Sequence, residues 1–170
     1  MTSFAPDIQS SNFTHMYDFI DYRNVNESKI KFNKESIFGY IYTNPNFSKF
    51  QKIIEKAMFC GYLDNTQGNF TIFIPEDTYL KHIPEDFFKN MDIGLAKEIL
   101  NSLIINGKIN KDVLTYSPVS YFYTRNPLTK LYITNISNKT VLNNNCNVIE
   151  FNINRNNGII HLIDNLLINQ

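Results

Sequence analysis

The sequence has few of the residues on which several kinds of site depend. It contains no tryptophan, two cysteines and six glycines among 170 residues. Cys60 and Cys146 are far apart and in no spacing typical of metal ligands, so we expect two buried free thiols, with a single disulfide as the alternative. No glycine-rich loop that binds phosphate and no dinucleotide-binding glycine motif occurs.

An excess of charge of either sign is also absent. Lysine plus arginine equals aspartate plus glutamate, 16 of each, and no run of basic residues is present. Nucleic acid and anionic membrane surfaces are therefore not expected partners. No apolar run approaches the ~18 residues of a membrane span, and residues 1–7 lack the basic and apolar regions of an export signal. We expect no membrane span, and the sequence does not indicate a compartment.

Motifs of catalytic sites are missing as well. There is no Gly-x-Ser-x-Gly, no Cys-His signature and no His-Glu-x-x-His. His161 and Asp164 could in principle form an acid/base pair or half of a metal site, but residues three apart in a strand point to opposite faces. We expect His161 to be hydrogen-bonded in the core. We also expect no enzymatic activity, no metal and no cofactor.

Isoleucine, asparagine and aromatic residues are abundant instead. The chain has 23 Ile, 25 Asn, 14 Phe and 10 Tyr, and 43% of its residues are hydrophobic. Its length and composition indicate one globular domain with an extension. The Ile and Asn content is typical of A/T-rich genomes, such as those of large DNA viruses, some protists and some bacteria.

Residues 1–33 are predicted to form an N-terminal extension. Phe13, Met16, Tyr17 and Ile20 have the spacing of one face of a short amphipathic helix. This helix would pack on the domain or dock a neighbouring molecule. Phe13, Met16 and Tyr17 are therefore candidate interface residues.

Helices are predicted to come first in residues 34–170. Asn44 and Pro45 suit the start of a helix of about four turns, because asparagine caps a first turn and proline favours the first helical position. Gly61 would end this helix in a left-handed conformation. Another helix is predicted over residues 92–106, where apolar residues recur at helical spacing.

Strands are predicted around and after these helices. Residues 70–74 suit a strand, and Asp77 is placed to cap the short helix that follows. From Ile109 onward apolar residues alternate between turns, which is typical of a series of antiparallel strands. The closing run, residues 157–168, would hold one strand or two strands joined by a turn at Asp164. Helices followed by antiparallel strands predict an α+β fold.

Two segments of the chain resemble the signature segments of the fasciclin domain. Residues 70–80 are similar to a pattern of Thr, aliphatic, Phe, small residue, Pro, any residue and Asn or Asp before a short helix. Residues 157–168 are similar to the segment Asn-Gly-aliphatic-aliphatic-His-aliphatic-Ile-Asp. The helix-then-strand order between them also matches, and the resemblance covers about residues 35–170. The structural residues that it indicates are Thr71, Pro75, Asp77, Gly158, His161 and Asp164.

The resemblance implies a wedge of N-terminal helices packed on an antiparallel β-sandwich. It also implies a non-catalytic adhesion or protein-interaction module that binds a protein or carbohydrate partner, because most fasciclin domains are not enzymes. One alternative is a structural component of a viral or cell-surface assembly, in which the extension hooks a neighbour or the chain forms a homo-oligomer. The other is a small-molecule or lipid-binding domain with a pocket between helices and sheet.

An aromatic cluster supplies a second candidate interface. Tyr116, Tyr121, Phe122 and Tyr123 lie close to Arg125, and alternation along a strand would expose some of these rings and bury others. Exposed tyrosine beside arginine is typical of protein interfaces. The alternative is that all these rings pack on the sheet. The candidate interface residues of this cluster are Tyr116, Tyr121, Tyr123 and Arg125.

Overall fold

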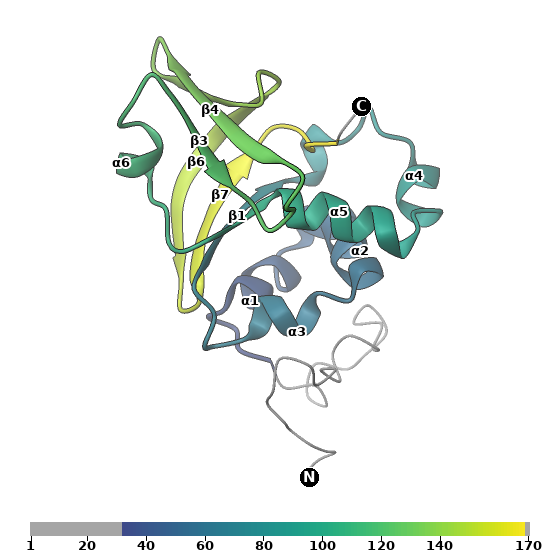
Figure 1. Cartoon of the computed structure of the whole chain (residues 1–170). Coiled ribbons are helices and arrows are strands. Elements are labelled where there is room, and N and C mark those ends of the chain that lie inside the picture. The colour runs from purple at the N-terminus through teal and green to yellow at the C-terminus, as the bar shows by residue number, and fades with distance from the viewer. Residues whose placement is uncertain (1–31, 169–170) are drawn as a thin grey trace.

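Helices and strands separate along the chain, as the sequence predicts. The computed structural model describes residues 32–168 (Figure 1). The helices are α1 (Ile37–Tyr42), η3 (Pro45–Phe47), α2 (Ser48–Ala57), α3 (Cys60–Asp64), η4 (Asp77–Tyr79), α4 (Glu85–Lys89), α5 (Ile93–Ser102) and α6 (Lys111–Leu114). The strands are β1 (Phe70–Pro75), β2 (Ile104–Asn106), β3 (Val119–Tyr123), β4 (Lys130–Ile136), β5 (Lys139–Leu142), β6 (Cys146–Arg155) and β7 (Gly158–Ile163). Figure 1 shows α1 to α5 in one half of the molecule and most of the sheet in the other.

The strands form one seven-stranded sheet in the order β2-β1-β7-β6-β5-β4-β3. Strands β3 to β7 pair antiparallel with their sequence neighbours, as predicted. Strand β1, however, lies parallel to β7, with pairs from Phe70–Gly158 to Pro75–Ile163. The α+β class is confirmed, and the sheet is mixed rather than wholly antiparallel. The two signature segments are thus neighbouring central strands.

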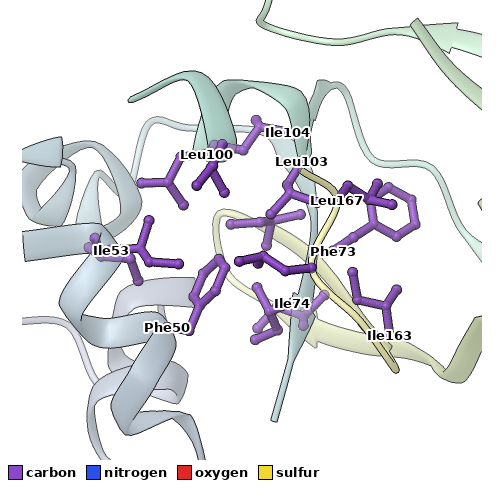
Figure 2. Packing of buried hydrophobic residues seen from close by; sticks show 14 of the residues in the cluster. Phe50, Ile53, Phe73, Ile74, Leu100, Leu103, Ile104, Ile163 and Leu167 are labelled. Carbon is purple, nitrogen blue, oxygen red and sulfur yellow. The ribbon is translucent and has the colours of Figure 1, made fainter. Parts of the chain in front are cut away.

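The main core lies where the helices meet β1 and β7. All six residues of each of these strands are buried, so both faces of the strands are covered. Helix α2 buries Phe50, Ile53, Ile54 and Ala57, the spacing of one helical face. Figure 2 shows Phe50 and Ile53 of α2 facing side chains of β1, with Leu100 of α5 beside them.

Two predicted helix ends differ from the structure. Helix α2 ends at Ala57, where Met58 adopts the left-handed conformation at φ 60°, and Gly61 lies inside α3. Burial of Leu63 on α3 explains why the chain turns earlier than its glycine suggests. Helix α5 ends at Ser102, and residues 104–106 form β2, which pairs with β1. Apolar residues at a helix end suit a buried strand equally well, so the pattern could not separate the two.

The C-terminal run also differs in part from the prediction. β7 ends at Ile163, and no second strand follows it up to residue 168. Leu166 and Leu167 are buried in irregular backbone. Of the two alternatives, the structure therefore has the single strand, and the turn between two final strands is wrong. The carboxylate of Asp164 instead accepts hydrogen bonds from the backbone nitrogen and side-chain amide of Asn147, at 2.8 and 2.9 Å.

Both cysteines are buried free thiols, as expected. Burial, together with the nearby carboxylate of Asp164, raises the pKa of the Cys146 thiol to about 12. A thiol reacts through its thiolate, so Cys146 is inert at neutral pH.

Gly158 makes the parallel pairing of β1 and β7 possible. Its φ is +157°, and a Cβ atom at this position would lie 2.0 Å from the carbonyl oxygen of Phe70. Because that neighbour is backbone of the paired strand, no rotamer change can relieve the contact. Any side chain here would push β1 away from β7.

We expect Gly158→Ala to lower the free energy of unfolding by about 3 kcal/mol or more, because the added methyl group collides with β1. Gly94→Ala is the matched control. Gly94 lies in α5, and its added Cβ would meet only an Asp92 oxygen at 3.4 Å, so this variant should gain about 0.5 kcal/mol. Urea unfolding of both variants checks this, and equal effects would contradict the steric explanation.

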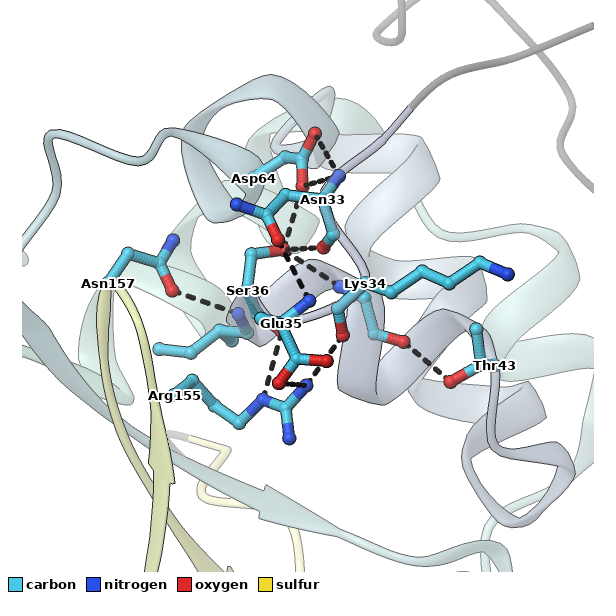
Figure 3. A network of polar contacts seen from close by, with 10 residues as sticks. Asn33, Lys34, Glu35, Ser36, Thr43, Asp64, Arg155 and Asn157 are labelled. Carbon is cyan, nitrogen blue, oxygen red and sulfur yellow. Dashed lines mark hydrogen bonds and ion pairs between the residues drawn. The ribbon is translucent and has the colours of Figure 1, made fainter.

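The β6–β7 hairpin holds the start of α1 through polar contacts (Figure 3). The Asn157 side-chain oxygen accepts a hydrogen bond from the Ile37 backbone nitrogen at 2.9 Å, and its amide donates to the Leu63 carbonyl at 2.8 Å. Arg155 donates to the carbonyl oxygens of Ser36 and Lys34, at 3.2 and 2.5 Å. Asn157 of the second signature segment therefore anchors two helices.

Asp64 holds the same segment from α3. One carboxylate oxygen accepts hydrogen bonds from the Ser36 hydroxyl at 2.7 Å and the Asn33 backbone nitrogen at 3.0 Å. The side chain is buried, and burial raises the pKa of Asp64 from 3.8 to about 6. The hydrogen bonds oppose this rise, because they favour the charged form.

We expect Asp64→Asn to remove a pH dependence of stability. The folded-state pKa is raised, so the contribution of Asp64 is present in full below pH 3.8 and is lost as pH rises through about 6. The difference in unfolding free energy between variant and wild type should therefore grow by about 2–3 kcal/mol in favour of the variant from pH 4 to pH 7. Urea titrations across this range check it, and a difference independent of pH would contradict it.

Candidate functional site

The outer face of the β3–β4 hairpin carries exposed tyrosines. Along β3, Val119, Tyr121 and Tyr123 are exposed and alternate with half-buried residues. The register places Tyr121 opposite Tyr132 and Tyr123 opposite Lys130. The exposed fractions of Tyr121, Tyr123 and Tyr132 are 50%, 69% and 51%. We call these five residues, Val119, Tyr121, Tyr123, Lys130 and Tyr132, the tyrosine face.

The opposite face of the hairpin explains why these rings point outward. Leu131 and Ile133 of β4 are buried in the core, and Phe122 of β3 packs against it. Because side chains alternate between the two faces of a strand, the residues between them are turned to the surface. The core therefore positions the tyrosine face without using its rings.

Lys130 gives the tyrosine face a positive charge. Its ammonium nitrogen lies 4.5 Å from the ring centroid of Tyr121 and 5.4 Å from that of Tyr123. The Tyr121 and Tyr123 rings meet edge to face at 5.8 Å, and Tyr132 lies 6.1 Å from Tyr121. Cation–π and edge-to-face contacts of this kind are favourable and stabilise this arrangement of the rings.

Arg125 does not join the tyrosines as the sequence suggested. Its guanidinium carbon lies 4.5 Å from the ring centroid of Tyr62, and its Nε donates to the Asn101 side-chain oxygen at 3.3 Å. The cation beside the tyrosines is Lys130, which sequence reasoning missed together with Tyr132. Knowledge of which residues pair across the hairpin would have identified both Lys130 and Tyr132. The sequence did not show the length of the loop between β3 and β4, so this pairing could not be predicted.

The other candidate interface residues lie in different places. Tyr116 is 89% exposed in the turn between α6 and β3, three residues before Val119. Leu128, also highly exposed, lies in the loop between β3 and β4. Phe13, Met16 and Tyr17 lie outside the described residues.

Thr71 and His161, from the two signature segments, both bond the backbone of Ile109. The Thr71 hydroxyl donates to the Gly107 carbonyl at 2.7 Å and accepts from the Ile109 nitrogen at 2.8 Å. His161 Nε2 lies 2.7 Å from the Ile109 carbonyl oxygen, and its Nδ1 accepts from the Asn152 nitrogen at 3.1 Å. A carbonyl only accepts, so Nε2 carries the proton. The two side chains thus fasten the segment between β2 and α6.

His161 is fully buried and makes no pair with Asp164. Its ring lies between Phe73 and Phe151, with centroids 5.4 and 5.6 Å away. Burial lowers the pKa of His161, and the hydrogen bond to Ile109 opposes this. Asp164 bonds Asn147 instead. Both ring nitrogens of His161 are engaged, so this arrangement offers no acid/base pair.

Asp77 caps a helix, but not the one expected from the sequence. Its carboxylate accepts from the backbone nitrogens of Ser48 and Lys49, at 3.2 and 2.9 Å, and from the Ser48 hydroxyl. These are the first residues of α2, which has no cap of its own. Helix η4, in which Asp77 lies, has no side-chain cap. Pro75, also from the first signature segment, is buried and pairs with Ile163.

Within residues 32–168, no group of three or more His, Cys, Asp or Glu side chains is placed to hold a metal ion. Nor does any helix there have the length and apolar character needed to cross a membrane.

Comparison with known proteins decides the family. The model of the fasciclin domain matches residues 45–169. The chain belongs to the fasciclin domain family. Fasciclin domains are commonly adhesion or interaction modules and are generally non-catalytic. No curated protein matches the chain.

A solved structure shows the same fold. It is a pair of FAS1 domains from the insect cell adhesion molecule fasciclin I, with a TM-score of 0.66 and 24% sequence identity. The match covers 79% of this chain and 51% of that one, so this chain spans about half of its length. The fasciclin fold is therefore confirmed.

We expect His161→Ala to lower the free energy of unfolding by about 1–3 kcal/mol or more, because two buried hydrogen bonds are lost. The folded-state pKa of His161 is lowered, so its contribution is present above pH ~6.5 and is lost as pH falls through the folded pKa. The difference between wild type and variant should therefore shrink below pH ~6.5. His82→Ala, at an exposed histidine, is the control and should change stability by less than about 0.5 kcal/mol. Urea unfolding from pH 5 to 8 measures both, and equal effects would contradict the prediction.

Proposed function

We propose that the chain is a non-catalytic protein-interaction module of the fasciclin type and that the tyrosine face is its contact surface. The observation that carries this proposal is the arrangement of three exposed tyrosines on one hairpin, with Lys130 over the rings of Tyr121 and Tyr123. Tyrosine supplies a large contact area with few rotatable bonds, so little conformational entropy is lost on binding. Tyrosine-rich patches of this kind are typical of the centres of protein interfaces.

The distribution of exposed apolar residues supports this location. Twelve large hydrophobic side chains are exposed in the described part of the chain, and nine of them lie between residues 113 and 149. The other three are Met58, Tyr79 and Ile93. Scattered exposed apolar residues need no explanation, but their concentration in this stretch of the chain, which includes the β3–β4 hairpin, supports the proposed contact surface.

A carbohydrate partner is the alternative that uses the same rings.

A role in an assembly through the extension is a further alternative, but residues 1–31 lie outside the described residues. The Asn33 backbone nitrogen donates a hydrogen bond to Asp64, and the Asn33 carbonyl oxygen accepts one from the Ser36 hydroxyl. We therefore propose that the domain begins just before Asn33. Residues 1–31 would then be the part available to hook a neighbour.

We expect the double variant Tyr121→Ser, Tyr123→Ser to lose its partner in affinity capture from the source organism, with affinity reduced at least about 30-fold. The control is Tyr79→Ser, at an exposed tyrosine of η4 far along the chain from the hairpin, which should recover the same partner as wild type. Circular dichroism establishes that each variant is folded.

Treating the captured material with glycosidases separates the two kinds of partner. Loss of capture after treatment would indicate a carbohydrate ligand on the same face. Undiminished capture by the double variant would overturn the proposed contact surface. Failure of every form to recover a partner would count against the interaction module itself.

A further inference from the structure

The tyrosine face continues along β4 and onto β5. Side chains two apart in a strand share a face, so Ile136 lies on the same face of β4 as Lys130 and Tyr132. Ile136 is 64% exposed, and its partner in the register is Lys139, an exposed residue of β5. We call the tyrosine face together with Ile136 and Lys139 the extended tyrosine face.

Two lysines lie at opposite ends of this surface. Lys130 is the first residue of β4, and Lys139 lies beside Ile136, six residues further along the strand. At about 3.3 Å per residue, the two positions are about 20 Å apart along β4. Tyr121 and Tyr132 are paired between them. The extended tyrosine face is therefore an apolar surface with a positive charge at each end.

No negative charge accompanies these lysines. Residues 113–149 contain three cations and no aspartate or glutamate, so all 16 acidic residues lie elsewhere in the chain. Cations of the helices are compensated, since Lys49 and Lys52 of α2 both pair with Glu85. Within residues 32–168, by contrast, neither Lys130 nor Lys139 forms an ion pair. A partner could therefore supply the missing carboxylates.

The acids that flank this stretch have places outside the extended tyrosine face. Asp112 lies in the first turn of α6, where a carboxylate is favourable to the helix dipole. Burial raises the pKa of Tyr40 in α1, and the charge of Glu150 adds to this rise, so Glu150 lies close to α1. Neither acid belongs to the surface that carries the two lysines.

The tyrosine hydroxyls give the surface further hydrogen-bond donors. In the described part of the chain, the hydroxyls of Tyr121, Tyr123 and Tyr132 make no hydrogen bond. A phenol can donate to a carboxylate, and hydrogen bonds to an ionised acceptor are stronger than those between neutral groups. Lys130 lies over two of these rings, so one carboxylate could contact its ammonium group and a hydroxyl together.

We propose that the extended tyrosine face binds an acidic polypeptide in which carboxylates flank a short apolar segment. One carboxylate would meet Lys130 and a tyrosine hydroxyl, and the other would meet Lys139. The apolar side chains between them would pack on Tyr121, Tyr132 and Ile136. An extended chain covers about 20 Å in about six residues. This inference rests on the function proposed above and names the chemistry of the partner.

The aliphatic side chains favour a polypeptide over other anionic partners. Nucleic acids and sulfated polysaccharides carry many negative charges close together, and they bind where basic residues are clustered. The extended tyrosine face has two lysines far apart and exposes Val119 and Ile136 as well. Aliphatic surface is stabilised by contact with apolar side chains, which a polypeptide supplies and these polymers lack.

Nuclear magnetic resonance titration of the full 170-residue chain with synthetic peptides tests the proposal. The probe is Glu-Glu-Leu-Thr-Phe-Thr-Leu-Glu-Glu, and its counterpart has lysine in place of every glutamate. The acidic peptide should bind with a Kd below about 1 mM and shift amide signals of residues 119–142, because its charges oppose those of the two lysines. The basic peptide should bind at least about tenfold more weakly.

Charge reversal on the protein provides the matched comparison. Lys139→Glu should weaken binding of the acidic peptide about tenfold, because it turns an attraction into a repulsion. Lys97→Glu is the control. Lys97 is exposed in α5, so the net charge changes equally while binding should change less than threefold. Equal effects of the two substitutions would overturn the proposal, and so would a wild-type chain that does not bind the acidic peptide.

Two further outcomes separate this inference from the function on which it rests. If both peptides bind alike and Tyr121→Ser, Tyr123→Ser loses both, the contact surface stands and the acidic partner is wrong. If heparin, a sulfated polysaccharide, binds more tightly than the acidic peptide and the tyrosine substitutions leave its binding unchanged, the polypeptide is wrong. Loss of the acidic peptide alone in the double tyrosine variant is the expected result.

Discussion

The parallel pairing of β1 with β7 is the constraint on which the rest of the structure depends. It exists because Gly158 has no side chain where the Phe70 carbonyl approaches. The pairing places the two signature segments side by side, although many residues separate them in the chain. Helices cover the resulting strands, and every residue of both is buried.

Polar residues within and next to these strands fasten the surrounding elements. Asp77 caps α2, Asn157 anchors α1 and α3, and Thr71 and His161 together hold the segment before α6. Each of these contacts gives a backbone group of a neighbouring element a hydrogen-bond partner. The signature residues therefore account for the architecture. The core does not use the outward rings of the β3–β4 hairpin, which leaves them available for the interaction that we propose.

How far the sequence could predict the fold depends on the range of the interactions involved. β1, the start of α5 at Asp92 and the alternation along β3 follow from local patterns, and the structure has all three. The ends of α2 and α5 were wrong, because burial of α3 and pairing of β2 with β1 outweighed the local signals at Gly61 and Ile104. In the candidate site, the outward direction of Tyr121 and Tyr123 was predictable. The cation was not, since Lys130 reaches them only through the register of the hairpin.

The sequence by itself determined the α+β class, the fasciclin resemblance and the alternation that exposes the tyrosines, because each depends on residues close together in the chain. Only the tertiary structure decided that β1 and β7 run parallel, that Asp77 caps α2 and that Lys130 rather than Arg125 accompanies the tyrosines. These outcomes depend on contacts between distant residues, which form only when the whole core closes.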